Sequence, residues 1–253
     1  MNRHLSLRSG NPALTKNTFK NISYSGTDKM TLEGTVNKTA IALLLLIFSA
    51  AYTWNMNPEN SSSLLLIGMF GGFIVGIATH FKKDWAPITT PIYAVLKGLA
   101  LGIVSRIYND YLGYPGIVEQ AIFLTFGILF CLLFAYKTRI IKATENFKLG
   151  VFAATGGIFL VYLGSFIYSL FTGYSFGVFN PQNGSLMSIG ISLFIVVIAS
   201  LNLVLDFDFI EEASENGAPK YMEWYGAFGL LVTLIWLYLE ILRLLAKLNS
   251  RRS

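Results

Sequence analysis

Seven long apolar runs alternate with short polar segments along this 253-residue chain. A helix needs about 20 apolar residues to cross the hydrocarbon core of a bilayer, and the runs are close to that length. Each run is therefore predicted to be a membrane-spanning helix. The runs cover residues 38–54, 64–81, 87–108, 117–136, 149–171, 186–205 and 224–245.

A polar, turn-rich segment precedes the first run. We do not expect it to be a cleaved signal peptide, because no apolar stretch occurs within its first thirty residues. The predicted organisation is a polar cytoplasmic tail over residues 1–37, followed by a seven-helix transmembrane domain over residues 38–253.

The composition agrees with this pattern. Hydrophobic residues make up 54% of the chain and charged residues only 13%, with a mean hydropathy of +0.56. Soluble domains carry roughly 25% charged residues, so the chain falls outside the soluble class. The predicted fold class is an all-α membrane protein whose main partner is the lipid bilayer.

Few residues offer catalytic or metal-binding chemistry. Cys131 is the lone cysteine, and His4 and His80 lie far apart in sequence. We find no nucleotide-binding loop and no His/Cys cluster with metal-ligand spacing. The sequence therefore predicts no enzyme activity, no cofactor and no metal site. The net charge of +5 relates to membrane orientation rather than to nucleic-acid binding.

Lys and Arg residues predict the orientation. With the N-terminus inside, 13 of the 19 fall in inner segments and five in outer ones. Cytoplasmic loops carry the excess of Lys and Arg, so the N-terminus is predicted to be cytoplasmic. Seven full crossings would place the basic C-terminus outside, against the same rule. Either the earlier loops override it or the last run does not cross fully.

Glycines at regular spacing predict close helix packing. Gly68, Gly72 and Gly76 share one face of the second run, where another helix can approach closely. The fifth run holds a second set of small residues for which we predict the same role, namely Gly156, Gly157 and Gly164.

Charged residues at membrane depth are the candidate functional residues, because such charges are costly and are usually paired. Glu240 stands alone among Leu, Ile, Trp and Tyr in the last run, and Asp206 lies in an acidic hinge over residues 205–212. Lys97 lies in the middle of the third run. It either faces the interior and answers a carboxylate or extends to the interface, and both interpretations stay open.

Spacing alone does not bring the two acids together. Glu240 lies 16 residues past Trp224, which is roughly 24 Å along a regular helix. A pair with Asp206 at the end of the sixth run requires the last helix to start later or to be shifted. The alternative is that Asp206 and Asp208 cap or solvate a helix end while Glu240 bonds Lys97 or Arg243.

Several short motifs resemble the Bax inhibitor-1/YccA-like family, the transmembrane Bax-inhibitor-motif proteins, and most closely a bacterial branch of it. The two C-terminal motifs are the most specific. The motifs lie at residues 9–12, 91–93, 97–99, 121–125, 136–137, 141–147, 203–210 and 236–243.

The resemblance implies a seven-helix bundle with the last helix central, located in the bacterial cytoplasmic (inner) membrane. It also implies that Asp206 and Glu240 form a proton-sensitive pair that gates a leak of calcium ions, with Asp208 and Lys97 as candidate ion-path residues or charge partners. Two positions depart from the family pattern. The second acid is commonly Asp, and the position of Lys97 is often acidic.

Two carboxylates within hydrogen-bond reach in a low-dielectric site share one proton, because both cannot ionise cheaply. Loss of that proton would leave two like charges that push the sixth and seventh helices apart. The main hypothesis is thus a pH-sensitive cation leak channel. The alternative is a regulator that binds a membrane protease or another partner. A small-solute transporter would need paired broken helices, which the sequence does not indicate.

Overall fold

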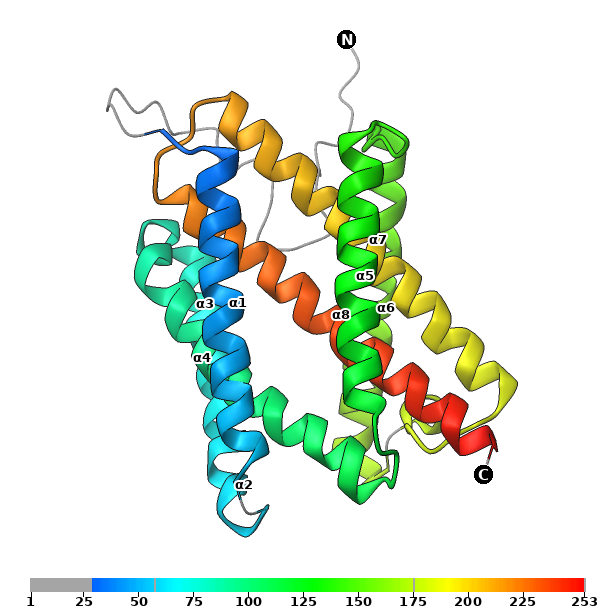
Figure 1. Cartoon of the computed structure of the whole chain (residues 1–253). Coiled ribbons are helices and arrows are strands. Elements are labelled where there is room, and N and C mark those ends of the chain that lie inside the picture. Colours follow the sequence, from blue (N-terminus) through cyan, green and yellow to red (C-terminus); the bar gives the residue numbers. More distant parts are fainter. Residues whose placement is uncertain (1–28, 57, 175, 253) are drawn as a thin grey trace. The chain divides into compact units, whose positions relative to one another are not determined.

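The computed structural model describes residues 29–56, 58–174 and 176–252, and it is helical almost throughout these ranges. Figure 1 shows the elements in chain order. They are α1 (Leu32–Trp54), α2 (Pro58–Leu66), the π-helical turn η2 (Ile67–Gly71), α3 (Gly72–Phe81), the 3-10 turn η3 (Lys83–Trp85), α4 (Ala86–Arg106), the π-helical turn η4 (Ile107–Tyr111), α5 (Ile117–Lys137), α6 (Glu145–Thr172), the 3-10 turn η5 (Gly177–Phe179), α7 (Leu186–Glu215) and α8 (Met222–Arg252).

Seven helical spans in the described part of the chain are long and apolar enough to cross a membrane. α2, η2 and α3 together supply one of them, and η3, α4 and η4 supply another. The prediction of an all-α, seven-helix membrane protein is confirmed. The last helix is also among the most enclosed, because 56% of its most apolar stretch is buried, against 17% for α1.

The prediction of an acidic hinge after the sixth run is wrong. α7 continues through this segment to Glu215, ten residues beyond the predicted end at Leu205. Asp and Glu do not stop a helix, and the segment contains neither Gly nor Pro. The break comes at Gly217, whose φ of +65° is the left-handed conformation typical of a helix end, and Pro219 follows it.

The first helix begins earlier than predicted. Thr31 caps α1 by accepting a hydrogen bond from the backbone N–H of Gly34 at 2.9 Å, which satisfies one of the free N–H groups of the first turn. Residues 32–37, assigned to the tail from sequence, are therefore helical. Residues 1–28 of the predicted tail lie outside the described residues.

The helices form two compact units. We call residues 29–113 and 208–232 the α1–α4 unit, and residues 114–207 and 233–252 the α5–α6 unit. Each unit contains one segment of α7 and one segment of α8, so both long helices belong to two cores.

Glycine lets two backbones approach closely in the α1–α4 unit. Gly98 and Gly102 of α4 lie so near α1 that a Cβ atom would collide with the carbonyl oxygens of Leu46 and Ala50, respectively. The hydroxyl of Thr53 crosses the same contact and donates to the carbonyl oxygen of Leu99 at 3.0 Å. α1 and α4 are thus held at the short distance that small residues permit.

The glycine groove predicted on the second span is confirmed. Gly68 abuts the backbone of α4 at Leu96, Gly72 contacts the side chain of Lys97, and Gly76 faces the ring of Tyr93. The prediction of a second packing surface on the fifth run is wrong, because a Cβ atom at any of three glycine positions of α6 would meet open space. These positions are Gly156, Gly157 and Gly164.

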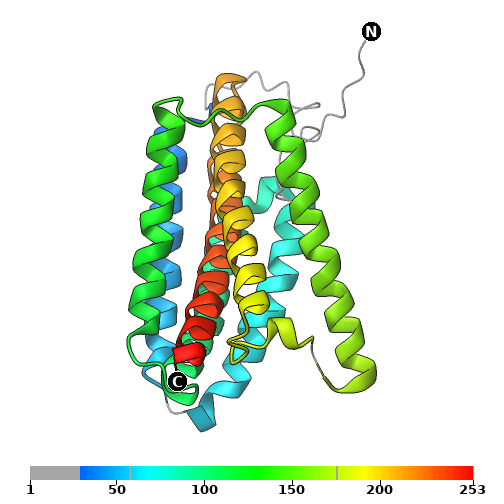
Figure 2. The same cartoon turned by 90° about the vertical axis from the view of Figure 1, so that its right-hand side faces the viewer.

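In the α5–α6 unit, segments of α7 and α8 lie between α5 and α6 (Figure 2). Ile158 of α6 packs against Ile195 and Ile198 of α7, and Trp236 of α8 joins this apolar cluster. The amide of Asn202 on α7 donates to the hydroxyl of Thr155 on α6 at 2.8 Å. Tyr162 of α6 also packs against this cluster, and its phenol bonds Glu240.

The π-helical turn η4 ends the third span with one wide turn. The N–H of Leu112 donates to the carbonyl oxygen of Ile107, five residues earlier, at 3.0 Å. Such turns are rare and occur mostly as single interruptions of α-helices, frequently at functional sites.

The α1–α4 contact predicts the effect of one methyl group. Gly98→Ala should destabilise the protein by about 1–3 kcal/mol, because the added Cβ forces the two backbones apart. Gly127→Ala on α5 is the matched control, since its Cβ meets open space. Unfolding in detergent micelles measures both. Equal stability of the two variants would contradict the close contact.

Candidate functional site

Asp206 lies on α7 within the α5–α6 unit and is completely buried. Its Oδ2 atom accepts a hydrogen bond from the hydroxyl of Thr233 on α8, with an oxygen–oxygen distance of 2.6 Å. A hydroxyl can donate to a carboxylate or accept from a carboxylic acid, so this contact suits either protonation state of Asp206. The contact joins the two long helices at one point of their shared core.

Glu240 lies on α8 in the same unit, with only 2% of its surface exposed. The phenol of Tyr162 on α6 donates to its Oε1 atom at 2.6 Å. Nη1 of Arg243, one turn further along α8, lies 2.9 Å from both carboxylate oxygens. The guanidinium thus balances the charge of the carboxylate, as the sequence-based alternative for Glu240 allowed.

Arg243 completes a closed triangle of polar groups. Its Nη1 atom also donates to the Tyr162 phenol oxygen at 2.9 Å. The guanidinium carbon lies 5.6 Å from the centre of the Tyr162 ring and 5.9 Å from that of Phe179, both within the range of a cation–π contact. Arg243, Tyr162 and Glu240 therefore hold one another in place.

The pairing of Asp206 with Glu240 expected from the resemblance stays a prediction. Asp206 meets α8 at Thr233, and Glu240 follows seven residues later, about 10 Å along the helix axis. Positions seven residues apart share nearly the same face of a helix. The two carboxyl groups thus lie along one face of α8, and the recorded partners of Glu240 are Tyr162 and Arg243.

The other two candidate residues lie elsewhere. Lys97 is half-buried on α4 in the α1–α4 unit, with its Nζ atom 5.8 Å from the centre of the Tyr93 ring. Among the described residues, no carboxylate forms an ion pair with Lys97. Asp208 is half-buried on α7 and faces away from Asp206, because positions two apart do not share a helix face.

Sequence reasoning missed a buried lysine near the end of α8. Lys247 is completely buried, and its Nζ atom donates to the hydroxyl of Ser192 at 2.7 Å, the carbonyl oxygen of Ser188 at 3.2 Å and the carbonyl oxygen of Val178. Its position seven residues after Glu240 was the available signal, since this spacing places both on one face of the helix. Tyr162 gave no such signal within its apolar run.

A second missed charge lies in the α1–α4 unit. Glu223, in the first turn of α8, is completely buried and accepts from the N–H and the hydroxyl of Thr31, both at 3.0 Å. Nζ of Lys220 lies 3.2 Å and Nζ of Lys38 4.0 Å from its carboxylate. Glu223 therefore ties the start of α1 to the start of α8. Because Glu223 lies next to a polar linker in the sequence, its burial could not be predicted.

The described residues contain no group of three or more His, Cys, Asp or Glu side chains that could hold a metal ion. The available chemistry is that of buried acids and their hydrogen-bond donors. Such groups can hold and release protons, and they can offer carboxylate oxygens to a passing cation.

The comparisons with known proteins agree with this architecture. The sequence model of the family described as Bax inhibitor 1 like matches residues 11–250. No curated protein and no solved structure matched the chain. The family match spans nearly the whole chain, including all seven spans and both buried acids of the α5–α6 unit. The chain belongs to the Bax inhibitor 1 like family.

Proposed function

We propose that this protein is a proton-sensitive cation leak channel, with calcium as the expected ion, and that Asp206 and Glu240 control the leak. The observation that carries the proposal is the burial of two carboxylates on membrane-long helices. Asp206 on α7 is 0% exposed and Glu240 on α8 is 2% exposed. Carboxylates at this depth are costly and are retained for pairing, proton transfer or ion passage.

The hydrogen bonds of the two acids suggest how the gate works. Glu240 in the described arrangement is held by Arg243 and Tyr162, whereas Asp206 is held by Thr233. Side chains of a helix lean toward its N-terminus, so the Glu240 side chain can point along α8 toward Thr233 and Asp206, and a shift of α7 along α8 closes the rest of the roughly 10 Å between the two positions. Two arrangements therefore compete for Glu240.

Protonation selects between these arrangements. A proton shared by Asp206 and Glu240 stabilises the arrangement in which the two carboxyl groups meet and bridge α7 to α8. Loss of that proton as the pH rises leaves two like charges, which drives Glu240 back to Arg243 and leaves Asp206 ionised in the core. An ionised Asp206 draws water and cations between the helices, and the leak opens.

We also propose that the protein lies in the bacterial cytoplasmic membrane with its N-terminus inside, as the Lys and Arg distribution favours. The α5–α6 loop then faces the cytoplasm and the α6–α7 loop faces outward.

Removing either acid should abolish the response to pH. Purified wild-type protein in liposomes should pass calcium faster above neutral pH than below it, as followed with an entrapped calcium dye. Asp206→Asn and Glu240→Gln should each give a flux that no longer changes with pH, because a neutral amide cannot release the proton.

Glu119→Gln is the matched control, since Glu119 is exposed at the start of α5. The gate is disproved if both core variants keep the wild-type pH profile. Wild-type protein that passes no cation at any pH would instead favour the regulator of a membrane partner.

The triangle around Glu240 predicts a shift of the pH profile. Tyr162→Phe removes the phenol that donates to Glu240 and so weakens the Arg243-bound arrangement. Since a hydrogen bond to a charged group contributes about 1.5–3 kcal/mol, the midpoint of flux activation should move up by roughly one pH unit or more.

Tyr168→Phe on the same helix is the control, because its exposed ring contacts Phe176 and not the acids. A Tyr162→Phe midpoint that stays in place or moves to lower pH would argue against exchange of Glu240 between two partners.

Orientation can be measured by labelling of single cysteines in a Cys131→Ser background. A membrane-impermeant maleimide should label Ser185→Cys in intact cells and Lys142→Cys only after lysis, because the two loops lie on opposite sides. The reverse pattern would place the N-terminus outside.

A further inference from the structure

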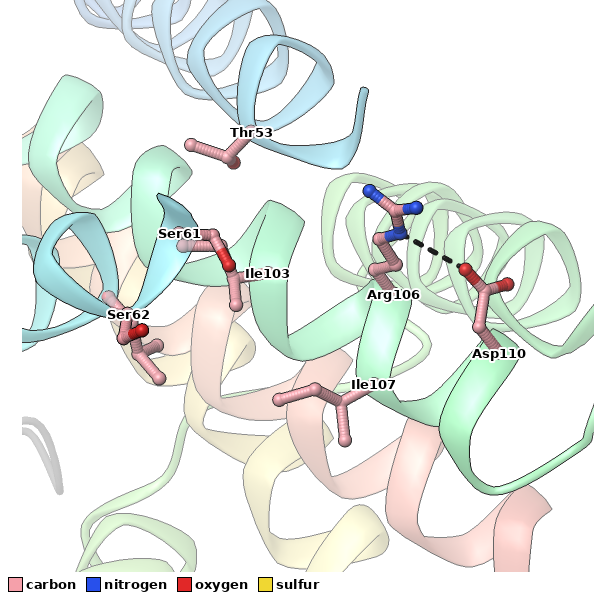
Figure 3. A pocket seen from close by; sticks show the side chains of 8 residues that line it. Thr53, Ser61, Ser62, Ile103, Arg106, Ile107 and Asp110 are labelled. Atoms are coloured by element: carbon pink, nitrogen blue, oxygen red, sulfur yellow. Dashed lines mark hydrogen bonds and ion pairs between the residues drawn. The ribbon is translucent and has the colours of Figure 1, made fainter. Parts of the chain in front are cut away.

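A pocket of about 310 Å³ lies within the α1–α4 unit, where α1, α2, α4 and η4 meet. This volume falls at the lower end of the range of about 300–1,000 Å³ found for small-molecule sites. In Figure 3, Ser61 and Ser62 of α2 lie across the pocket from Arg106 and Asp110. The pocket is lined by Thr53, Ser61, Ser62, Leu65, Ile103, Arg106, Ile107 and Asp110.

The polar side of the pocket is a cation–anion pair. Nε of Arg106 donates to Oδ2 of Asp110 at 3.1 Å, as the dashed line in Figure 3 marks. Nη1 of Arg106 donates to the backbone carbonyl oxygens of Trp54 and Met56. A guanidinium has five N–H donors, and no partner of the two on Nη2 is recorded among the side chains that the structure describes.

The carboxylate of Asp110 can also accept more hydrogen bonds than it has in the structure. Its Oδ1 atom accepts from the amide of Asn109 at 2.8 Å, and its side chain is 51% exposed. Each carboxylate oxygen can accept two hydrogen bonds, so Asp110 can accept further donors. The pocket therefore offers donors and an acceptor side by side, with no net charge.

The pocket lies where candidate membrane spans begin and end. Among the described residues, the candidate spans end at Trp54, begin at Ser61 and end at Asp110, and all three points lie at or next to the pocket. Leu65, Ile103 and Ile107 supply an apolar wall beside the charged pair. A ligand at this level meets both headgroup and acyl-chain surroundings.

We propose that this pocket binds a zwitterionic phospholipid whose headgroup carries a phosphate and a primary ammonium. The phosphate accepts from Nη2 of Arg106, the ammonium donates to Asp110, and the glycerol end lies against Leu65 and Ile107. A primary ammonium has N–H donors that a quaternary one lacks, and Asp110 repels a purely anionic headgroup. Phosphatidylethanolamine has this chemistry, and the site is independent of ion conduction.

Native mass spectrometry of the purified full chain in detergent tests the proposal. Phosphatidylethanolamine should bind at least roughly tenfold more tightly than phosphatidylglycerol or phosphatidylcholine, as one charge-assisted hydrogen bond would give. Asp110→Asn should remove this preference, and Arg106→Gln should weaken binding of all three lipids. Arg252→Gln, which removes an exposed guanidinium near the C-terminus, should change neither.

Arg106 also braces the end of α1, so Arg106→Gln is accompanied by Arg106→Lys, which keeps the positive charge. Asp110→Asn leaves the hydrogen bonds from Arg106 to the end of α1 intact. It therefore still tests the proposal if both Arg106 variants fail to fold. Equal affinity of wild type for the three lipids, or an unchanged preference in Asp110→Asn, overturns the proposal. Full displacement of the lipid by soluble phosphoethanolamine overturns the lipid assignment, and weak displacement supports it.

Discussion

A charge within a membrane-length helix must find its partner inside the protein, because lipid supplies none. This constraint shapes the described core. Glu240 is matched by Arg243 and Tyr162, and Lys247 by three oxygen atoms of one hydroxyl and two backbone carbonyls. Glu223 is matched by Thr31 and Lys220. The contacts made by Tyr162, Thr31 and Lys247 also fix a helix to its neighbour, so the cost of burying charge is offset by specific packing.

The same constraint changes how a proton gate would act in this chain. Titration of one isolated pair of acids would need them in contact throughout. Glu240 has a strong competing partner in Arg243, so in the proposed gate a change of state would be an exchange of partners rather than a simple gain of charge. Exchange between two well-bonded arrangements gives two distinct states, as switching requires.

Hydropathy was sufficient to find all seven spans, because a crossing helix must be apolar over about 20 residues whatever it packs against. Rarity was sufficient to single out Asp206 and Glu240. Arg243 could be named as a partner of Glu240 because it lies one turn away on the same helix. Tyr162 could not be predicted, since it lies 78 residues from Glu240 and looks like any aromatic residue of an apolar run. Glycine spacing identified the groove around Gly72 but also suggested one on α6, because spacing does not say whether a second helix is present.

The wide turn at η4 has a consequence for chain length. A π-helical turn holds one residue more than an α-helical turn would, and each residue of an α-helix advances the next by about 100°. Asp110 lies within this wide turn. A relative that lacks one residue between Ile107 and Asp110 would regain a regular helix, and its acid would then follow the arginine by three positions rather than four. Single-residue length differences at this point should therefore change the geometry of the charged pair among members of the family.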